Sequence, residues 1–141
     1  MKNKQMNPKT YQFSGKTINC YFDADFLKIQ QLVNFENTIF ITDENIFSKQ
    51  KEKFSGLKTI VIKAGEQFKN QHAVDKVIDE LITLQADRQT FIVGVGGGVV
   101  TDITGFAASI YMRGVKFGFV PTSILAMVDA SIGGKNGVDV G

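Results

Sequence analysis

The sequence predicts an α/β fold, in which a Rossmann-like parallel sheet carries helices on both faces, and three observations lead to this prediction. Runs of strand length alternate along the chain with longer segments of helical periodicity, as in consecutive βαβ units. Two of these runs, residues 38–42 and 91–95, are continuous rather than alternating, which is typical of strands buried on both faces. The chain has 141 residues, of which 43% are hydrophobic, enough for one such domain and too few for two. We therefore expect residues 1–141 to form a single domain.

The first half of the chain predicts three strands and two helices. Residues 17–22 alternate weakly and predict a strand, after which Asp25 is placed to cap a short helix. Residues 38–42 predict a second strand, and residues 45–54 predict a helix with a lysine-rich outer face. Residues 57–62 are rich in β-branched side chains and predict a third strand. Residues 1–10 have no such pattern, and we expect them to be frayed.

The second half predicts two helices and two further strands. The clearest helix spans residues 70–84, because its apolar residues repeat at the helical period while charged residues occupy the opposite face. Residues 91–95 predict a buried strand, and residues 99–112 a helix rich in small residues. Residues 115–120 predict a last strand that stops at Pro121. We expect right-handed crossovers between these parallel strands.

Polar and glycine residues follow four of the predicted strands. These residues are Asp43, Gly65, Gly96 and Thr122. In open parallel sheets, ligands bind beyond the carboxyl ends of the strands, at the point where the strand order reverses. We therefore expect the functional residues to lie along one edge of the sheet.

Composition argues against several classes of partner. The formal net charge is +2 with only two arginines, and no basic stripe suggests nucleic-acid binding. The apolar runs are far shorter than the roughly 20 residues of a membrane span, and no secretory signal is visible. We therefore expect a cytoplasmic protein that binds neither nucleic acid nor membranes. The single cysteine, Cys20, is interpreted as a buried apolar residue. With His72 as its only histidine, the chain is not expected to hold a histidine-rich zinc site.

Three consecutive glycines, Gly96, Gly97 and Gly98, follow a buried strand and open the next helix. A helix N-terminus presents unpaired N–H groups and the positive end of the helix dipole to an anion. The run does not match the Gly-x-Gly-x-x-Gly fingerprint, so a standard Rossmann motif is absent. We interpret the run as a phosphate cradle, because glycine costs conformational entropy and packing alone would favour alanine.

Two interpretations remain open for most polar residues near this run. Asp43 is placed either to accept hydrogen bonds from a ribose diol or to cap the following helix. Asp102 is placed to reach a ribose hydroxyl, or it is a favourable charge near a helix N-terminus. Thr122 and Ser123 either donate hydroxyl hydrogen bonds to a ligand or cap the next helix. The loop at residues 65–69 is either part of the site or an ordinary polar loop.

Three charged residues lie further along the chain. Asp129 and Lys135 occur in an apolar, glycine-rich stretch where an unpaired charge is costly. Lys135 is suited to pair with a phosphate or carboxylate of a substrate. Arg113 precedes Gly114 at a helix C-terminus, where the helix dipole favours a cation in any case.

Four segments of the second half together resemble the 3-dehydroquinate synthase family. They are Gly-Gly-Gly-Val-Val-Thr-Asp at 96–102, Gly-Phe-Ala-Ala-Ser-Ile-Tyr-Met-Arg-Gly at 105–114, Val-Pro-Thr-Ser-Ile-Leu-Ala at 120–126, and Val-Asp-Ala-Ser-Ile-Gly-Gly-Lys at 128–135. Gly-Glu-Gln-Phe-Lys at 65–69 and Thr-Asp-Glu at 42–44 extend the resemblance, which begins at about Phe40.

The resemblance implies a Rossmann-like NAD-binding domain and an enzyme of the shikimate pathway to aromatic amino acids. Such a lyase converts 3-deoxy-D-arabino-heptulosonate 7-phosphate to 3-dehydroquinate and releases phosphate. It uses NAD and a divalent metal, zinc or cobalt. Carried over by motif, the residues implied to bind NAD are Asp43, Glu66, Lys69, Gly97, Gly98, Val99, Asp102, Thr122 and Ser123.

The resemblance also implies substrate-binding residues. Asp129 and Lys135 would bind the substrate, and Arg113 would reach its phosphate from the partner subunit of a homodimer. Ser123 stands where threonine is usual in the family, and Asn136 and Asp139 stand where many members have Thr and Asn, which implies altered local hydrogen bonding.

The family's metal ligands, a glutamate and two histidines, belong to a mainly helical second domain beyond residue 141. The resemblance therefore implies the N-terminal part of a two-domain enzyme, inactive by itself. Alternatives are a related sugar phosphate cyclase, a metal-dependent alcohol or glycerol dehydrogenase, and a non-catalytic binding module.

Overall fold

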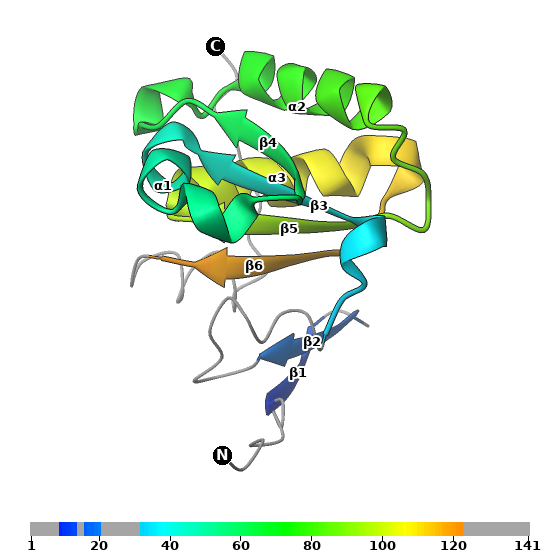
Figure 1. Cartoon of the computed structure of the whole chain (residues 1–141). Helices are drawn as coiled ribbons and strands as arrows, with labels where there is room; N and C mark the ends of the chain where they lie inside the picture. Colours follow the sequence, from blue (N-terminus) through cyan, green and yellow to red (C-terminus); the bar gives the residue numbers. More distant parts are fainter. Residues whose placement is uncertain (1–8, 14–15, 21–31, 123–141) are drawn as a thin grey trace.

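The centre of the fold is a parallel sheet of four strands, shown in the computed structural model in Figure 1. The model describes residues 9–13, 16–20 and 32–122. The strand order is β4-β3-β5-β6, and every neighbouring pair is parallel. The strands are β3 (Thr38–Asp43), β4 (Lys58–Ile62), β5 (Phe91–Gly96) and β6 (Phe117–Pro121). The predicted α/β class is confirmed, and these four strands begin and end within two residues of the predicted bounds.

The predicted first strand belongs to a different sheet. β1 (Lys9–Phe13) and β2 (Lys16–Cys20) pair as an antiparallel hairpin, with Lys9 opposite Cys20. The prediction of a strand at 17–22 within the parallel sheet was therefore wrong in its partner. Residues 9 and 10, at the end of the segment predicted to be frayed, belong to β1. The signal that sequence analysis missed is Ser14-Gly15, a two-residue connection with glycine between two strand-like runs. The helix predicted after Asp25 lies outside the described residues.

Helices cover both faces of the sheet. α2 (Gln71–Thr83) and α3 (Gly98–Ile110) contact each other, and α3 also contacts β5, β3 and β6. α1 (Glu44–Lys49) and the short 3-10 helix η3 (Lys51–Phe54) pack against the opposite face. The predicted helix over 45–54 is thus broken at Gln50, whose backbone is not helical, with φ −126° and ψ 34°. The described residues contain three further 3-10 helices: η2 (Phe35–Asn37), η4 (Glu66–Phe68) and η5 (Tyr111–Arg113).

Two hydrophobic cores result, because successive side chains of a strand point to opposite faces of the sheet. Ile39 and Ile41 of β3 join the core under α2 and α3, whereas Phe40, between them, joins the core under α1 and η3. All three side chains are fully buried. The continuous apolar character of this strand therefore reflects burial on both faces, as predicted.

The strand order reverses between β3 and β5. The chain leaves β3 for β4 on one side and then returns past β3 to form β5 on the other. The carboxyl ends of β3 and β5 therefore flank the switch point, where open α/β sheets bind ligands. Beside it, the buried Thr42 hydroxyl donates a hydrogen bond of 2.8 Å to the Val95 carbonyl oxygen and joins the two strands.

In the part of the chain that the structure describes, no helix has the length and apolar character that crossing a membrane requires.

Candidate functional site

The N-terminus of α3 lies at the switch point. β5 ends at Gly96, and α3 begins two residues later at Gly98. Gly97 is the N-cap with an extended backbone, and no side chain of the described residues caps the helix. The first helical hydrogen bond runs from the Thr101 N–H to the Gly97 carbonyl oxygen, at 3.0 Å. The N–H groups before Thr101 therefore point out of the helix with the positive end of its dipole, as an anion site requires.

Glycine is needed at the positions of this turn for different structural reasons. A Cβ atom on Gly94 would lie 2.5 Å from the Thr104 hydroxyl oxygen, and one on Gly96 would lie 2.6 Å from Val100 Cγ2. Both glycines thus allow α3 to pack closely on β5, and the interpretation that packing would favour alanine was wrong for Gly96. A Cβ on Gly98 would meet nothing within 4 Å. Open space in front of the backbone is what close approach of a ligand needs, so Gly98 is compatible with the original interpretation, which stays a prediction.

Asp43 caps a helix, one of the two possibilities left open by the sequence. It ends β3 and is the N-cap of α1, where its Oδ1 accepts a hydrogen bond of 2.8 Å from the Ile46 N–H. The side chain is half-buried beside the switch point. Because the cap uses only one of the two carboxylate oxygens, it is compatible with a further role in binding.

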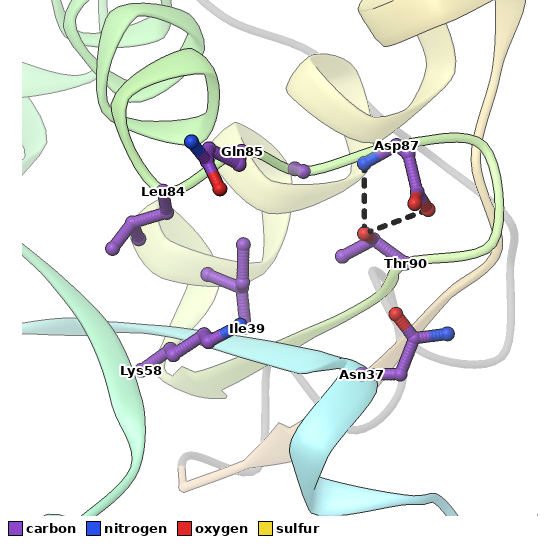
Figure 2. A pocket seen from close by; sticks show the side chains of 8 residues that line it. Asn37, Ile39, Lys58, Leu84, Gln85, Asp87 and Thr90 are labelled. Carbon is purple, nitrogen blue, oxygen red and sulfur yellow. Dashed lines mark hydrogen bonds between the residues drawn. The ribbon is translucent and has the colours of Figure 1, made fainter.

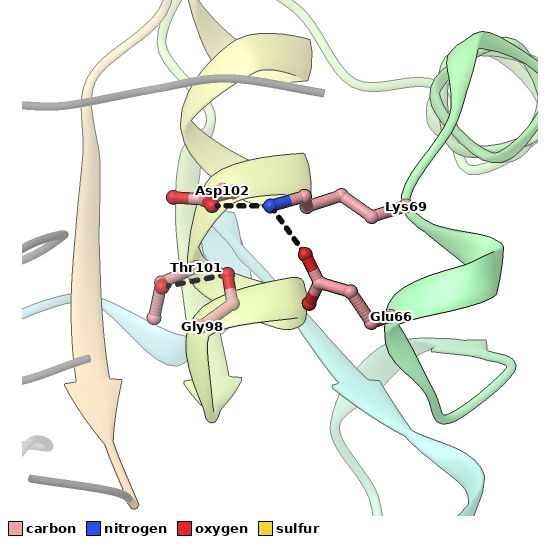
Figure 3. Close-up of polar contacts among 5 residues, drawn as sticks. All are labelled: Glu66, Lys69, Gly98, Thr101 and Asp102. Carbon is pink, nitrogen blue, oxygen red and sulfur yellow. Dashed lines mark hydrogen bonds and ion pairs between the residues drawn. The ribbon is translucent and has the colours of Figure 1, made fainter. Parts of the chain in front are cut away.

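Three candidate residues form one charged cluster, which Figure 3 shows. The Lys69 ammonium group lies 2.7 Å from Glu66 Oε1 and 3.4 Å from Asp102 Oδ2. The exposed fractions of the Lys69 and Asp102 side chains are 18% and 15%, whereas that of Glu66 is 69%. The hydrogen bond to Glu66 raises the pKa of Lys69 above its ordinary value of 10.5, against the lowering effect of burial. The cluster connects the loop after β4 to the first turns of α3.

Other contacts hold the same loop in place. The Ala64 N–H donates a hydrogen bond of 3.2 Å to the Glu44 carboxylate of α1. The Lys63 ammonium group lies 5.3 Å from the centroid of the Phe68 ring, a cation–π contact. Gly65 has a φ of 119°, which favours glycine at this bend. Sequence analysis did not identify Glu44 as a residue that fixes this loop. Nothing in the sequence relates Glu44 to Ala64, which lies 20 residues later.

The remaining cofactor candidates are placed only in part. Val99 lies in the first turn of α3 and packs against the core. Thr122 follows β6, and its N–H donates a hydrogen bond of 2.8 Å to the Gly96 carbonyl oxygen, which brings it beside the glycine run. Ser123, Asp129 and Lys135 lie outside the described residues.

Arg113 is not brought to this site within one chain. It lies in η5 beyond the C-terminus of α3, and a helix of 13 residues separates the two ends by about 20 Å. The structure also shortens the predicted helix over 99–112, because α3 ends at Ile110. Met112, Arg113 and Gly114 then have φ values of 47°, 67° and 105°, a left-handed run that is uncommon for residues other than glycine.

A polar pocket lies at the other edge of the sheet, around the amino ends of β3 and β4 (Figure 2). The Asn37 side-chain amide donates a hydrogen bond of 2.6 Å to the Gln89 carbonyl oxygen, and the Thr90 hydroxyl donates to the Asp87 carboxylate. The pocket includes none of the predicted site residues. Its polar groups hold the loop before β5 against the start of β3.

Within residues 9–13, 16–20 and 32–122, no group of three or more histidine, cysteine, aspartate or glutamate side chains is arranged to hold a metal ion.

The fold and the site together define a Rossmann-like α/β domain with an uncapped helix N-terminus at its switch point. Comparison with known proteins identifies it further: the chain belongs to the 3-dehydroquinate synthase N-terminal family, which matches residues 59–141.

Curated relatives carry the same name. The chain is 52% identical over 80 residues to the 3-dehydroquinate synthase of Pyrococcus abyssi, covering 57% of this chain and 24% of the relative. It is 37% identical over 125 residues to the enzyme of Blochmanniella floridana, covering 83% of this chain and 34% of the relative. The chain thus spans about a quarter to a third of the length of these relatives.

Among solved structures, 2-deoxy-scyllo-inosose synthase in complex with carbaglucose-6-phosphate, NAD+ and Co2+ has a similar fold. The TM-score is 0.77 at 28% sequence identity, and the match covers 94% of this chain and 40% of that chain.

Proposed function

We propose that this chain is the NAD-binding part of a 3-dehydroquinate synthase. On this proposal, the longer enzyme converts 3-deoxy-D-arabino-heptulosonate 7-phosphate to 3-dehydroquinate and phosphate in the shikimate pathway. The observation that carries the proposal is the open N-terminus of α3, which lies at the switch point of a family member. The NAD+ in the similar 2-deoxy-scyllo-inosose synthase supports the same cofactor here.

The described residues fit a dinucleotide. The open space before Gly98 and the uncapped first turn of α3 would receive the pyrophosphate, with Gly97 and Val99 beside it. Asp102 and the second carboxylate oxygen of Asp43 are acceptors suited to ribose hydroxyls. When bound, NAD would take up a hydride from the substrate and return it.

The described residues do not fit a metal ion, and we assign no step to one. The Co2+ of the similar structure supports the expected divalent metal, cobalt or zinc, for the longer enzyme only. We infer a cytoplasmic location from the pathway that the family name implies.

We also propose that the enzyme works as a homodimer. Arg113 lies about one helix length from the cofactor end of its own chain, so a substrate phosphate near NAD would meet the arginine of a second copy. Next to Arg113, Ile110 and Met112 are exposed, and Ile82 of α2 is exposed nearby in the same shallow groove. Exposed apolar side chains gathered in one place are typical of association surfaces.

Two matched variants test the cofactor assignment. In Gly98→Ala, the new Cβ enters open space, so the melting temperature should be unchanged while it obstructs the approach of a phosphate to the backbone. Calorimetric titration with NAD+ should then give an affinity about tenfold or more below that of the wild type. Wild-type affinity in this variant would contradict the proposed contact.

The matched variant Gly96→Ala meets Val100 at 2.6 Å, so it should lower the melting temperature, because the helix or the side chain must shift. Together, the two variants separate a glycine that the ligand needs from a glycine that packing needs.

A second candidate is a sugar phosphate cyclase that acts on a different substrate. The similarity to 2-deoxy-scyllo-inosose synthase over 94% of this chain favours it. The higher identity to 3-dehydroquinate synthases favours the first proposal. Comparing turnover of the longer enzyme with heptulosonate and heptulose phosphates distinguishes the two.

A further inference from the structure

The cofactor end of the sheet carries several negative charges. Asp43 ends β3, Glu66 lies in the loop after β4, and Asp102 lies in the second turn of α3. On the proposed function, the same region must accept a diphosphate, which also carries negative charge. Of these carboxylates, Asp102 most needs a compensating positive charge. Its side chain is only 15% exposed, and it lies on the helix whose N-terminus would receive the anion.

Lys69 is placed to compensate these charges. It reaches Asp102 from a separate segment, 33 residues earlier in the sequence. Its ammonium group bonds to Glu66 and Asp102 at once, and its own side chain is 18% exposed. An ion pair that is shielded from water in this way is stronger than a fully exposed one. The loop that carries Lys69 is itself fixed by the contact of Ala64 with Glu44.

We propose that Lys69 is a positioning residue that acts through Asp102. It holds the Asp102 carboxylate toward the loop and balances its charge, so that the N-terminus of α3 keeps its positive character for a dinucleotide. This inference rests on the proposed function, since it concerns how the same site accepts NAD. It differs from a direct contact between Lys69 and the cofactor, because it makes the effect of Lys69 depend on Asp102.

A double-mutant cycle tests that dependence. NAD+ is titrated by calorimetry into the wild type, Lys69→Met, Asp102→Asn and the double variant. Lys69→Met should lose about tenfold or more in affinity, because the Asp102 charge loses its ion pair with Lys69. Asp102→Asn keeps a hydrogen-bonding side chain without the charge and should lose about threefold or less. The double variant should bind as Asp102→Asn does, within about threefold.

Two further variants serve as controls. Lys69→Arg keeps the charge and should stay close to the wild type, although its geometry differs. Lys76→Met removes an exposed lysine of α2, which is not part of the charged cluster, and should leave the affinity unchanged. Thermal melting identifies any variant that fails to fold, and Lys69→Gln replaces Lys69→Met in that case.

Two results would overturn the inference, and they are distinguishable. If the affinity losses of the single variants multiply in the double variant, Lys69 acts independently of Asp102, and the inference fails while NAD binding stands. If the wild type itself does not bind NAD+, the proposed function fails and the inference fails with it.

Discussion

At the scale of single residues, the buried hydroxyl of Thr104 is unusual. The side chain is fully buried in α3 against Gly94, and its oxygen has no hydrogen-bond partner among the described residues. A buried polar atom without a partner costs free energy that an apolar group of the same shape does not. We therefore expect the Thr104 hydroxyl to lower the stability of the domain.

Replacing this residue gives a direct prediction. Thr104→Val keeps the shape and removes the hydroxyl, so the free energy of unfolding should rise by about 1 kcal/mol. Thr101→Val is the matched control on the same helix, because the Thr101 hydroxyl donates a hydrogen bond of 3.2 Å to the Gly98 carbonyl oxygen. Urea unfolding followed by circular dichroism compares the two variants. Equal destabilisation of both would mean that the Thr104 hydroxyl has a partner.

Sequence reasoning found single candidate residues and missed their partners. Lys69, Glu66 and Asp102 were each expected to contact NAD, yet their mutual ion pairs were not predicted. The reason is physical: a motif identifies the type of residue at a strand end, but a contact between residues 33 positions apart depends on how a loop and a helix pack. Asp43 is a similar case. A helix cap and a ribose ligand both require a carboxylate that accepts hydrogen bonds, so the residue type does not distinguish the two roles.

At the scale of elements, the two central strands of the parallel sheet, β3 and β5, were predicted well because they are buried on both faces. A continuous apolar run of five residues has the length of a strand and is too short for a typical helix, so it indicates a strand. The helix over 45–54 was predicted less well, because helical periodicity does not indicate where the backbone breaks at Gln50. The hairpin of β1 and β2 was missed because the sequence patterns of its strands are weak and only two residues connect them.

The cap of α1 yields a prediction at this scale. Asp43→Ala removes the acceptor for the Ile46 N–H and should lower the free energy of unfolding by about 1 kcal/mol. Asp43→Asn keeps a capping oxygen and should lose much less. Urea unfolding measures both variants. Equal losses would show that the charge of Asp43, and not its cap, stabilises the end of β3.

At the scale of the whole molecule, the two ends of α3 have different proposed tasks. The N-terminus faces the cofactor region, whereas the C-terminus carries Arg113 and the exposed apolar residues beside it. A site that needs both ends is completed only by a second copy, in which the arginine of one chain meets the cofactor of the other. The domain would then contribute to two sites at once.

Self-association of the chain is therefore expected, and one substitution should weaken it. Ile110→Lys places a charge among the exposed apolar side chains, so sedimentation velocity should report a smaller associated fraction at equal protein concentration. Asn45→Lys makes the same addition of charge on α1, at an exposed position on the opposite face, and should have no such effect. A wild-type chain that stays monomeric at high concentration would contradict the proposed surface.

Gly94 and Gly96 are two residues apart on one face of β5, and the side chains above them, Thr104 and Val100, are one turn apart on α3. Because neither glycine has a Cβ atom, the surface of β5 is lower along the line that joins them, and α3 packs along this line. The two glycines therefore set both the distance of α3 from the sheet and its direction. The direction of the helix dipole is thus set by the packing of two buried glycines.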